Sequence, residues 1–315
     1  MKKSLFVVVT VMISLFSQAM AQNIYRNYAL LHGDIQEFPL TLINAYPFLD
    51  ASVNGVRGKF MFDTGNLNAL TLNSHAVPLK AGKLLGTGNV GSGQTFSTFI
   101  QDTVNEVRLG GGLIYQNLLQ IESENMDFLQ DHITPDCLGQ IGFGFFKGYL
   151  FKLDYFRNKI IFYKVTQRRR ITRDFLNGEH VIGKIRFEVR KRKNTPLIRL
   201  KIGPYLYIGA FDTGQYGLIQ SPEKIETYLI RHHLLQNAGV TGRGDTIQNL
   251  RLATSTGGFR FDLPGLERIP SNNILVQKRG MGITESNLVN LGFRFLNQFT
   301  TVWDYDRRVI YILRR

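Results

Sequence analysis

Two aspartates in matching contexts are the residues of this chain best suited to chemistry. Asp63 and Asp212 each lie in a Phe-Asp-Thr-Gly motif, and apolar residues flank both copies. Two carboxyl groups held close together cannot both ionise comfortably, so such a pair shares one proton. A pair of this kind supplies a general base and a general acid at once. A single Asp-Thr-Gly is weak evidence, because chance produces it in roughly a few per cent of chains of this length.

A longer frame recurs around both motifs and indicates an internal duplication. Each copy contains, in order, an aspartate, a glycine after an apolar residue and a second aspartate: Asp63, Gly142 and Asp154, then Asp212, Gly292 and Asp304. The successive spacings are 79 and 12 residues in the first copy and 80 and 12 in the second. An apolar run follows each second aspartate, so we expect Asp154 and Asp304 to have a structural role in a turn rather than a catalytic one.

The elements that would position these residues are mostly strands. Short apolar runs alternate with Gly, Asn and Asp turn signals, which predicts an all-β fold with few short helices. We expect two homologous β-barrel-like lobes related by a pseudo-twofold axis, at residues 45–165 and 195–315, joined by a basic connection at 166–194. The clearest helix signal begins at Ser221-Pro222-Glu223. Residues 22–44 precede the repeat, and the sequence leaves open whether they add a strand across both halves or form a short pro-segment.

A glycine-rich stretch follows each motif by about 25–30 residues. The first includes Gly88, Gly91 and Gly93, and the second includes Gly242 and Gly244. Glycine permits tight hairpin tips and close approach of the backbone to a ligand. We interpret these stretches as flaps over a cleft, with plain turns between strands as the alternative. A phosphate-binding loop is excluded, because neither stretch is followed by Gly-Lys-Ser/Thr or by a strand–loop–helix unit.

The first 21 residues have the pattern of a signal peptide. Lys2 and Lys3 form a positive start, residues 5–16 are apolar, and Ala19-Met20-Ala21 matches a cleavage site. We expect an exported chain, periplasmic or secreted, with no transmembrane segment after cleavage. A retained membrane anchor is the alternative, although the apolar run is short for a span.

The chain is strongly basic, with a formal net charge of +14, or +12 without the two lysines of the leader. Much of this charge lies in two runs, Arg168–Arg170 and Arg190–Lys193. A basic exported protein could meet anionic lipid, polysaccharide or nucleic acid. We favour a solvated face and linker, and expect no nucleic-acid partner, because aromatic residues do not interleave with the runs.

The remaining reactive residue types give no sign of a metal or cofactor. Cys137 is the only cysteine and lies at the start of an apolar segment, so we expect a small buried hydrophobe and no internal disulfide. The six histidines show no convincing metal-ligand spacing. We therefore expect neither a metal nor a cofactor.

The duplicated frame resembles that of the aspartic peptidases, in which each half carries an apolar-apolar-Asp-Thr-Gly, a glycine-rich flap, an apolar-Gly and a closing strand. The chain looks like a retropepsin-like unit duplicated within one chain, and the resemblance covers most of residues 45–315. It implies the acid-protease fold, aspartic endopeptidase activity on a peptide or protein, and a monomer, since both lobes lie in one chain. It also implies that Asp63 and Asp212 hold a water. The ionised member takes a proton as this water attacks the peptide carbonyl, and the protonated member hydrogen-bonds the developing oxyanion.

The resemblance also assigns supporting roles in the two loops. It implies that the hydroxyls of Thr64 and Thr213 reach across the axis to the opposite loop. It implies that Gly65 and Gly214 let each loop turn tightly and point an N–H toward the carboxylate.

The sequence departs from the family pattern directly after each motif. Pepsin-like sites carry Ser or Thr there, whereas this chain has Asn66 and Gln215. No tyrosine occurs in the first flap region, which is closer to the glycine-rich retroviral kind. These departures keep open a catalytically silent module that binds extended peptide or an envelope polymer. A third interpretation is a β-rich envelope protein whose basic face binds anionic polymer.

Overall fold

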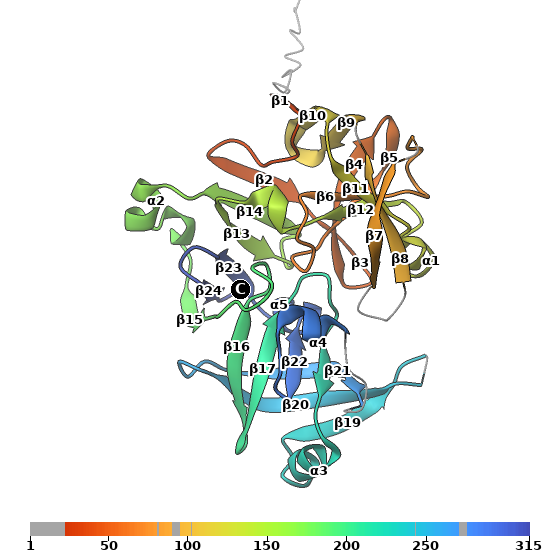
Figure 1. Cartoon of the computed structure of the whole chain (residues 1–315). Coiled ribbons are helices and arrows are strands. Elements are labelled where there is room, and N and C mark those ends of the chain that lie inside the picture. The colour runs from red at the N-terminus through yellow and green to blue at the C-terminus, as the bar shows by residue number, and fades with distance from the viewer. Residues whose placement is uncertain (1–22, 81, 90–94, 102, 243, 271–275) are drawn as a thin grey trace, which may run out of the picture.

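The computed structural model describes residues 23–80, 82–89, 95–101, 103–242, 244–270 and 276–315. It is mostly β and consists of an N-terminal and a C-terminal lobe with barrel-like sheets, so the predicted fold class is confirmed. Figure 1 shows the N-terminal lobe (red to yellow-green) above the C-terminal lobe (green to blue). The predicted signal peptide, residues 1–21, lies outside the described residues.

The N-terminal lobe is built on an eleven-stranded sheet. Its strands follow one another in the order β1 (Asn23–Arg26), β10 (Leu113–Leu118), β9 (Val104–Leu109), β4 (Tyr46–Val53), β5 (Val56–Phe62), β12 (Cys137–Ile141), β6 (Leu70–Asn73), β11 (Ile121–Glu124), β8 (Thr95–Gln101) and β7 (Lys83–Asn89). The remaining strand, β3 (Thr41–Ile43), pairs with β4. Cys137 is fully buried at the start of β12, as expected.

The C-terminal lobe repeats this plan with seven strands. Their order is β16 (Leu197–Ile202), β17 (Tyr205–Phe211), β22 (Leu288–Leu291), β18 (Leu218–Gln220), β21 (Arg260–Ile269), β20 (Thr246–Ser255) and β19 (Leu235–Val240). The pairing of β16 with β20 closes six of these strands into a barrel.

The two lobes share their strand pairings, not only their motifs. From β4 to β7 and from β16 to β19, the successive pairs are antiparallel, parallel, antiparallel, parallel, antiparallel and antiparallel. The lobes differ in closure, because β4 pairs with β9 where its counterpart β16 pairs with β20. The duplication inferred from spacing is therefore a duplication of topology.

A six-stranded sheet joins the lobes. Its order is β2 (Ile35–Pro39), β14 (Lys159–Lys164), β13 (Tyr149–Asp154), β23 (Thr300–Asp304), β24 (Val309–Leu313) and β15 (Val181–Arg186). Each lobe contributes a hairpin flanked by an earlier strand, and the hairpins meet where Phe151 pairs with Trp303. Residues 35–39 thus add a strand to the joining sheet, which the sequence had left open. The segment 166–194 holds their counterpart, β15.

The helices are short, and α3 with nine residues is the longest in the described part of the chain. The α-helices are α1 (Asp127–His132), α2 (Gln167–Thr172), α3 (Glu223–Arg231), α4 (Val276–Met281) and α5 (Phe293–Leu296). The 3-10 turns are η1 (Gly110–Gly112), η2 (Phe143–Phe146) and η3 (Asp174–Leu176). None of the helices in the described residues is long and apolar enough to cross a membrane.

Aromatic packing anchors the strands that carry the aspartate motifs. Trp303 is fully buried, stacks on Phe151 with ring centres 5.2 Å apart, and meets Phe211 edge-on at 5.5 Å. Phe62 meets Phe151 edge-on at 5.5 Å. Offset and edge-on pairs add to the hydrophobic burial. The residue before each motif aspartate is therefore packed against the joining sheet, which fixes both strand ends in one core.

Candidate active site

The two motif aspartates follow the ends of equivalent strands. Asp63 comes directly after β5 and Asp212 directly after β17, and each strand is held between an antiparallel and a parallel neighbour. The Asp63 N–H donates to the carbonyl of Ile141 at 2.9 Å, and the Phe211 N–H donates to Pro196 at 3.0 Å. The backbone at both positions is therefore fixed before any side chain is considered.

The glycines of the motifs allow the two loops to touch. The N–H of Gly65 donates to Asp63 Oδ1 at 2.7 Å, and that of Gly214 donates to Asp212 Oδ1 at 2.9 Å. A Cβ on Gly65 would lie 2.5 Å from Asp212 Oδ2, and one on Gly214 would lie 2.4 Å from Asp63 Oδ1. Each glycine therefore packs against the aspartate of the opposite lobe, and any side chain there would push the carboxyls apart.

The threonines bind the loops to each other across the lobes. The N–H of Thr64 donates to Thr213 Oγ1 at 2.9 Å, and the N–H of Thr213 donates to Thr64 Oγ1 at 3.1 Å. Thr213 Oγ1 also donates to the Phe62 carbonyl at 2.8 Å. Both threonines are fully buried. These reciprocal bonds have the arrangement that the resemblance implied for Thr64 and Thr213.

The two carboxyls form one electrostatic unit. They are hydrogen-bonded to each other. Burial raises the pKa of Asp212 well above its usual range, and the negative charge of Asp63 adds to the rise. Burial also raises the pKa of Asp63, partly offset by hydrogen bonds from Asp212 and from the N–H groups of Gly65 and Asn66. Protein surrounds the pair deeply, yet both residues keep partial exposure to solvent. The pair can thus hold one proton and still meet water.

The residues after the motifs support the loops differently from a serine or threonine. The Asn66 side chain donates to Thr71 Oγ1 at 3.0 Å and to Gln140 Oε1 at 2.8 Å, so its amide is used away from the Asp63 carboxylate. The Gln215 carbonyl accepts the N–H of Phe293 at 2.9 Å. Asn66 supports the site through its backbone N–H rather than its side chain.

The repeat glycines lie directly behind these loops. A Cβ on Gly142 would come within 2.5 Å of the Asn66 carbonyl, and one on Gly292 within 2.0 Å of the Gln215 carbonyl. The glycine at this position of the repeat therefore has a steric cause: a side chain there would collide with the backbone of the aspartate loop.

The glycine-rich stretches lie in equivalent hairpins. Gly88 is in β7 of the β7–β8 hairpin, while Gly91 and Gly93 lie outside the described residues. Gly242 and Gly244 are in the turn of the β19–β20 hairpin, where the Thr241 N–H donates to Asp245. Two matching hairpins agree with the sequence interpretation, and their role as flaps stays a prediction.

The repeat aspartates have the structural role expected of them. Asp154 Oδ1 accepts the N–H of Arg157 at 2.9 Å, and Asp304 Oδ1 accepts the N–H of Arg307 at 3.0 Å. Each carboxyl closes the turn between the two strands of its hairpin.

Sequence reasoning missed a polar support beneath the loops. The Asn194 side chain donates to the Thr64 carbonyl at 2.8 Å, and the Tyr305 hydroxyl donates to the Asn194 carbonyl at 3.0 Å. Tyr155 and Tyr305 are both close enough to Asp212 for its charge to raise their pKa further, beyond the main effect of burial. The only signal in the sequence is that each tyrosine directly follows a repeat aspartate.

A third carboxyl near the pair was also missed. Glu124, at the end of β11, is 8% exposed. Burial raises its pKa to about 7, and the charges of Glu122 and Asp63 contribute to the rise. The Asn68 amide that donates to Glu122 at 2.8 Å also donates to Thr71, which connects this strand to the Asp63 loop.

The basic runs are not uniformly solvated, which corrects the sequence interpretation. Arg169 is buried and binds Asp34 and Asp174, both at 2.9 Å. Arg190 is partly buried and pairs with Glu188 and Glu285. Arg168, Lys191 and Lys193 are exposed, so each run combines solvated cations with a structural arginine.

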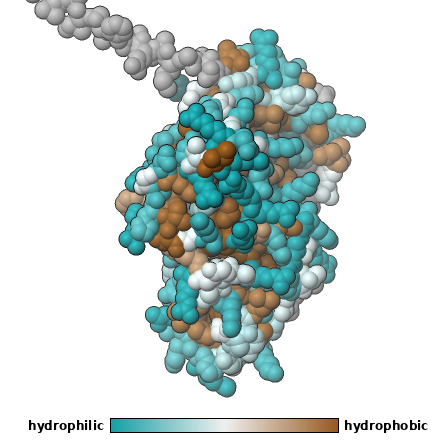
Figure 2. Space-filling view, turned by 90° about the vertical axis from the view of Figure 1, so that its left-hand side faces the viewer, coloured by the Kyte–Doolittle hydropathy of each residue, from teal (hydrophilic) through white to brown (hydrophobic). Residues whose placement is uncertain are grey.

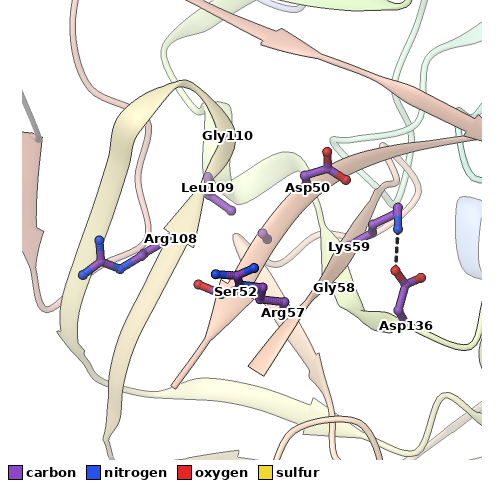
Figure 3. A pocket seen from close by; sticks show the side chains of 10 residues that line it. Asp50, Ser52, Arg57, Gly58, Lys59, Arg108, Leu109, Gly110 and Asp136 are labelled. Atoms are coloured by element: carbon purple, nitrogen blue, oxygen red, sulfur yellow. Dashed lines mark hydrogen bonds and ion pairs between the residues drawn. The ribbon is translucent and has the colours of Figure 1, made fainter. Parts of the chain in front are cut away.

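A groove of about 450 Å³ lies on the N-terminal lobe and contains no pair of carboxyls like that of Asp63 and Asp212. Figure 3 shows that it is lined by both signs of charge: the cations Arg57, Arg108 and Lys59 and the acids Asp50 and Asp136, with Lys59 bonded to Asp136. Neither Asp63 nor Asp212 lines it. The aspartate pair therefore remains the chemically distinctive site.

No family model matches the chain, and a comparison with curated proteins finds no match.

Proposed function

We propose that the chain is an exported aspartic endopeptidase that hydrolyses peptide bonds with a water activated by Asp63 and Asp212. The observation that carries the proposal is the hydrogen-bonded pair of carboxyls, one from each lobe, with raised pKa values and partial access to solvent. The duplicated motifs and the reciprocal threonine bonds support it, because both bring the carboxyls together in one fixed geometry.

In the proposed reaction the pair starts with one proton. The ionised carboxylate removes a proton from the water as its oxygen attacks the peptide carbonyl carbon. The protonated carboxyl hydrogen-bonds the carbonyl oxygen as negative charge develops there. Collapse of the tetrahedral intermediate breaks the C–N bond, and a proton passes from the pair to the leaving nitrogen. The pair titrates as a unit, so activity should fall when either the last proton is lost at high pH or both carboxyls are protonated at low pH.

The test is loss of cleavage in folded variants. Asp63→Asn and Asp212→Asn should each reduce kcat/KM on a diverse peptide library by at least about 10³-fold, the scale expected for removing general acid–base catalysis. Asp50→Asn, at an exposed aspartate outside the pair, is the matched control and should retain wild-type cleavage. Circular dichroism and the unfolding midpoint check that the inactive variants are folded. Wild-type cleavage in either variant would refute the assignment.

The second candidate is a silent binding module, favoured by one observation. The Asn66 amide is committed to Thr71 and Gln140 and gives the Asp63 carboxylate no side-chain support. A statine-type inhibitor distinguishes the two functions. Binding of the inhibitor by wild-type protein that cleaves no peptide at acidic or neutral pH would favour the module, whereas inhibitor-sensitive cleavage favours the peptidase.

A further inference from the structure

A basic pocket lies on the outer side of the joining sheet, away from the aspartate pair. Its volume is about 540 Å³, and its lining comes from the connecting segment 166–194 and the C-terminal lobe: Arg173, Lys184, Arg186, Thr256, Gly257, Arg307, Val309 and Tyr311. Strands β15 and β24 and the end of α2 carry most of it. They lie on the left in Figure 1, the side that faces the viewer in Figure 2, where hydrophilic side chains predominate and hydrophobic patches lie between them.

The charge of this pocket is of one sign. Four of its eight lining residues are cations, and none is acidic. Arg173, Lys184 and Arg186 form no ion pair within the described part of the chain. The groove of Figure 3 differs, because acidic side chains lie among its cations.

The acids nearest to these cations along the chain are engaged elsewhere. Asp174, next to Arg173, binds Arg169 at 2.9 Å. Asp306, next to Arg307, binds Arg170. The fold therefore uses other arginines to neutralise these two acids, and leaves Arg173, Lys184 and Arg186 without an ion pair in the described part of the chain.

Several contacts hold the pocket in shape. The guanidinium of Arg307 donates to the Arg170 carbonyl at 2.8 Å. The N–H of Thr256 donates to the Arg199 carbonyl at 3.0 Å, which fixes the hairpin turn at one wall. A Cβ on Gly183 of β15 would lie 2.4 Å from the Phe259 ring, so this turn packs closely against the sheet. The cations thus surround a preformed hollow.

The floor of the hollow is apolar. Val309 and Tyr311 are 8% and 4% exposed, and the Lys184 ammonium lies 5.9 Å from the centre of the Tyr311 ring. Charges above a surface that excludes water attract an anion more strongly than the same charges in open solvent. A guanidinium binds the oxygens of a phosphate with two parallel hydrogen bonds, and two or more such groups favour a multiply charged anion.

We propose that this basic pocket binds a phosphate-bearing anion through Arg173, Lys184, Arg186 and Arg307. The chemistry is that of a diphosphate or a clustered phosphomonoester, either free in solution or displayed on a lipid headgroup. The site is separate from the aspartate pair and does not depend on peptidase activity.

Binding of inorganic pyrophosphate and of vesicles tests the proposal. The protein without the expected signal peptide, residues 22–315, is titrated with pyrophosphate by calorimetry. It is also mixed with phosphatidic acid/phosphatidylcholine vesicles, whose anionic headgroup is a phosphomonoester, and, as a neutral reference, with phosphatidylcholine vesicles. The test variant is Arg173→Gln/Arg186→Gln. The matched control is Arg57→Gln/Arg108→Gln in the groove of Figure 3, which removes the same net charge.

The proposal is supported if the test variant binds the anion at least tenfold more weakly than wild type while the control variant binds it with wild-type affinity. Weaker binding of pyrophosphate by the test variant indicates a soluble phosphate ligand. Weaker binding of the anionic vesicles alone indicates a lipid headgroup. Equal weakening in both double variants would mean that net charge alone attracts the anion and would overturn the proposal. Absence of binding to pyrophosphate and to anionic vesicles would overturn it as well. Unfolding midpoints of both variants establish that each is folded.

Discussion

The threonine bonds between the lobes are unequal, and the inequality predicts different costs for two equivalent substitutions. Thr213 Oγ1 accepts the Thr64 N–H and donates to the Phe62 carbonyl, whereas Thr64 Oγ1 accepts the Thr213 N–H. All three residues are fully buried. Valine has nearly the shape of threonine, so Thr→Val mainly removes the hydroxyl.

The magnitude follows from the number of buried backbone groups that lose a partner. Each such group costs about 1–3 kcal/mol. Thr213→Val leaves two of them, the Thr64 N–H and the Phe62 carbonyl, and should lower the free energy of unfolding by about 2–6 kcal/mol. Thr64→Val leaves one, the Thr213 N–H, and should cost about 1–3 kcal/mol.

Chemical denaturation of both variants measures the difference. Thr213→Ser and Thr64→Ser keep the hydroxyl and serve as controls, with a cost of about 1 kcal/mol for the lost methyl group. The m-value checks that the transition keeps its two-state form. The reasoning is refuted if Thr213→Val costs no more than Thr64→Val, or if both valine variants lie within 1 kcal/mol of their serine controls.

Two further predictions concern a buried acid and a loop glycine. Glu124 has a raised pKa of about 7 in the folded state, so its contribution to stability is present at low pH and is lost as the pH rises through 7. The free energy of unfolding of Glu124→Gln, relative to that of wild type, should therefore rise by about 2–3 kcal/mol between pH 5 and pH 8.5. Urea unfolding measures this difference, and a difference that does not change with pH would contradict the reasoning. Gly292→Ala places a Cβ 2.0 Å from the Gln215 carbonyl and should cost about 1–3 kcal/mol and displace the Asp212 loop. Gly242→Ala, with open space around it, should be nearly neutral in thermal unfolding.

The sequence was sufficient to predict what repeats locally. Gly142 and Gly292 recur at nearly the same distance from Asp63 and Asp212, and both are glycines because each packs directly against its own aspartate loop. That steric requirement acts within one lobe and leaves a direct imprint on residue type and spacing. The strand-rich fold was predictable for the same reason, since the alternation of apolar runs and turn residues is local.

What the sequence could not supply depends on partners far along the chain. The Asn66 amide is oriented by Gln140, 74 residues away, and no local pattern announces that contact. Asn194 was assigned to a basic connection, yet its side chain supports the Thr64 carbonyl. The burial of Arg169 depends likewise on Asp34, 135 residues earlier, so composition alone suggested a solvated run.

The joining sheet has a consequence for the order in which the aspartate pair can form. Its two hairpins close loops of a few residues, but Phe151 and Trp303 are 152 positions apart when they pair. Loop-closure entropy makes that contact about 3 kcal/mol more costly than a hairpin turn. Long-range pairings of this kind also slow folding. The aromatic residues beneath both aspartates come together only through this pairing. A chain that has folded only its first lobe therefore has Asp63 without Asp212. The two carboxyls can share a proton only once the second lobe has folded onto the first.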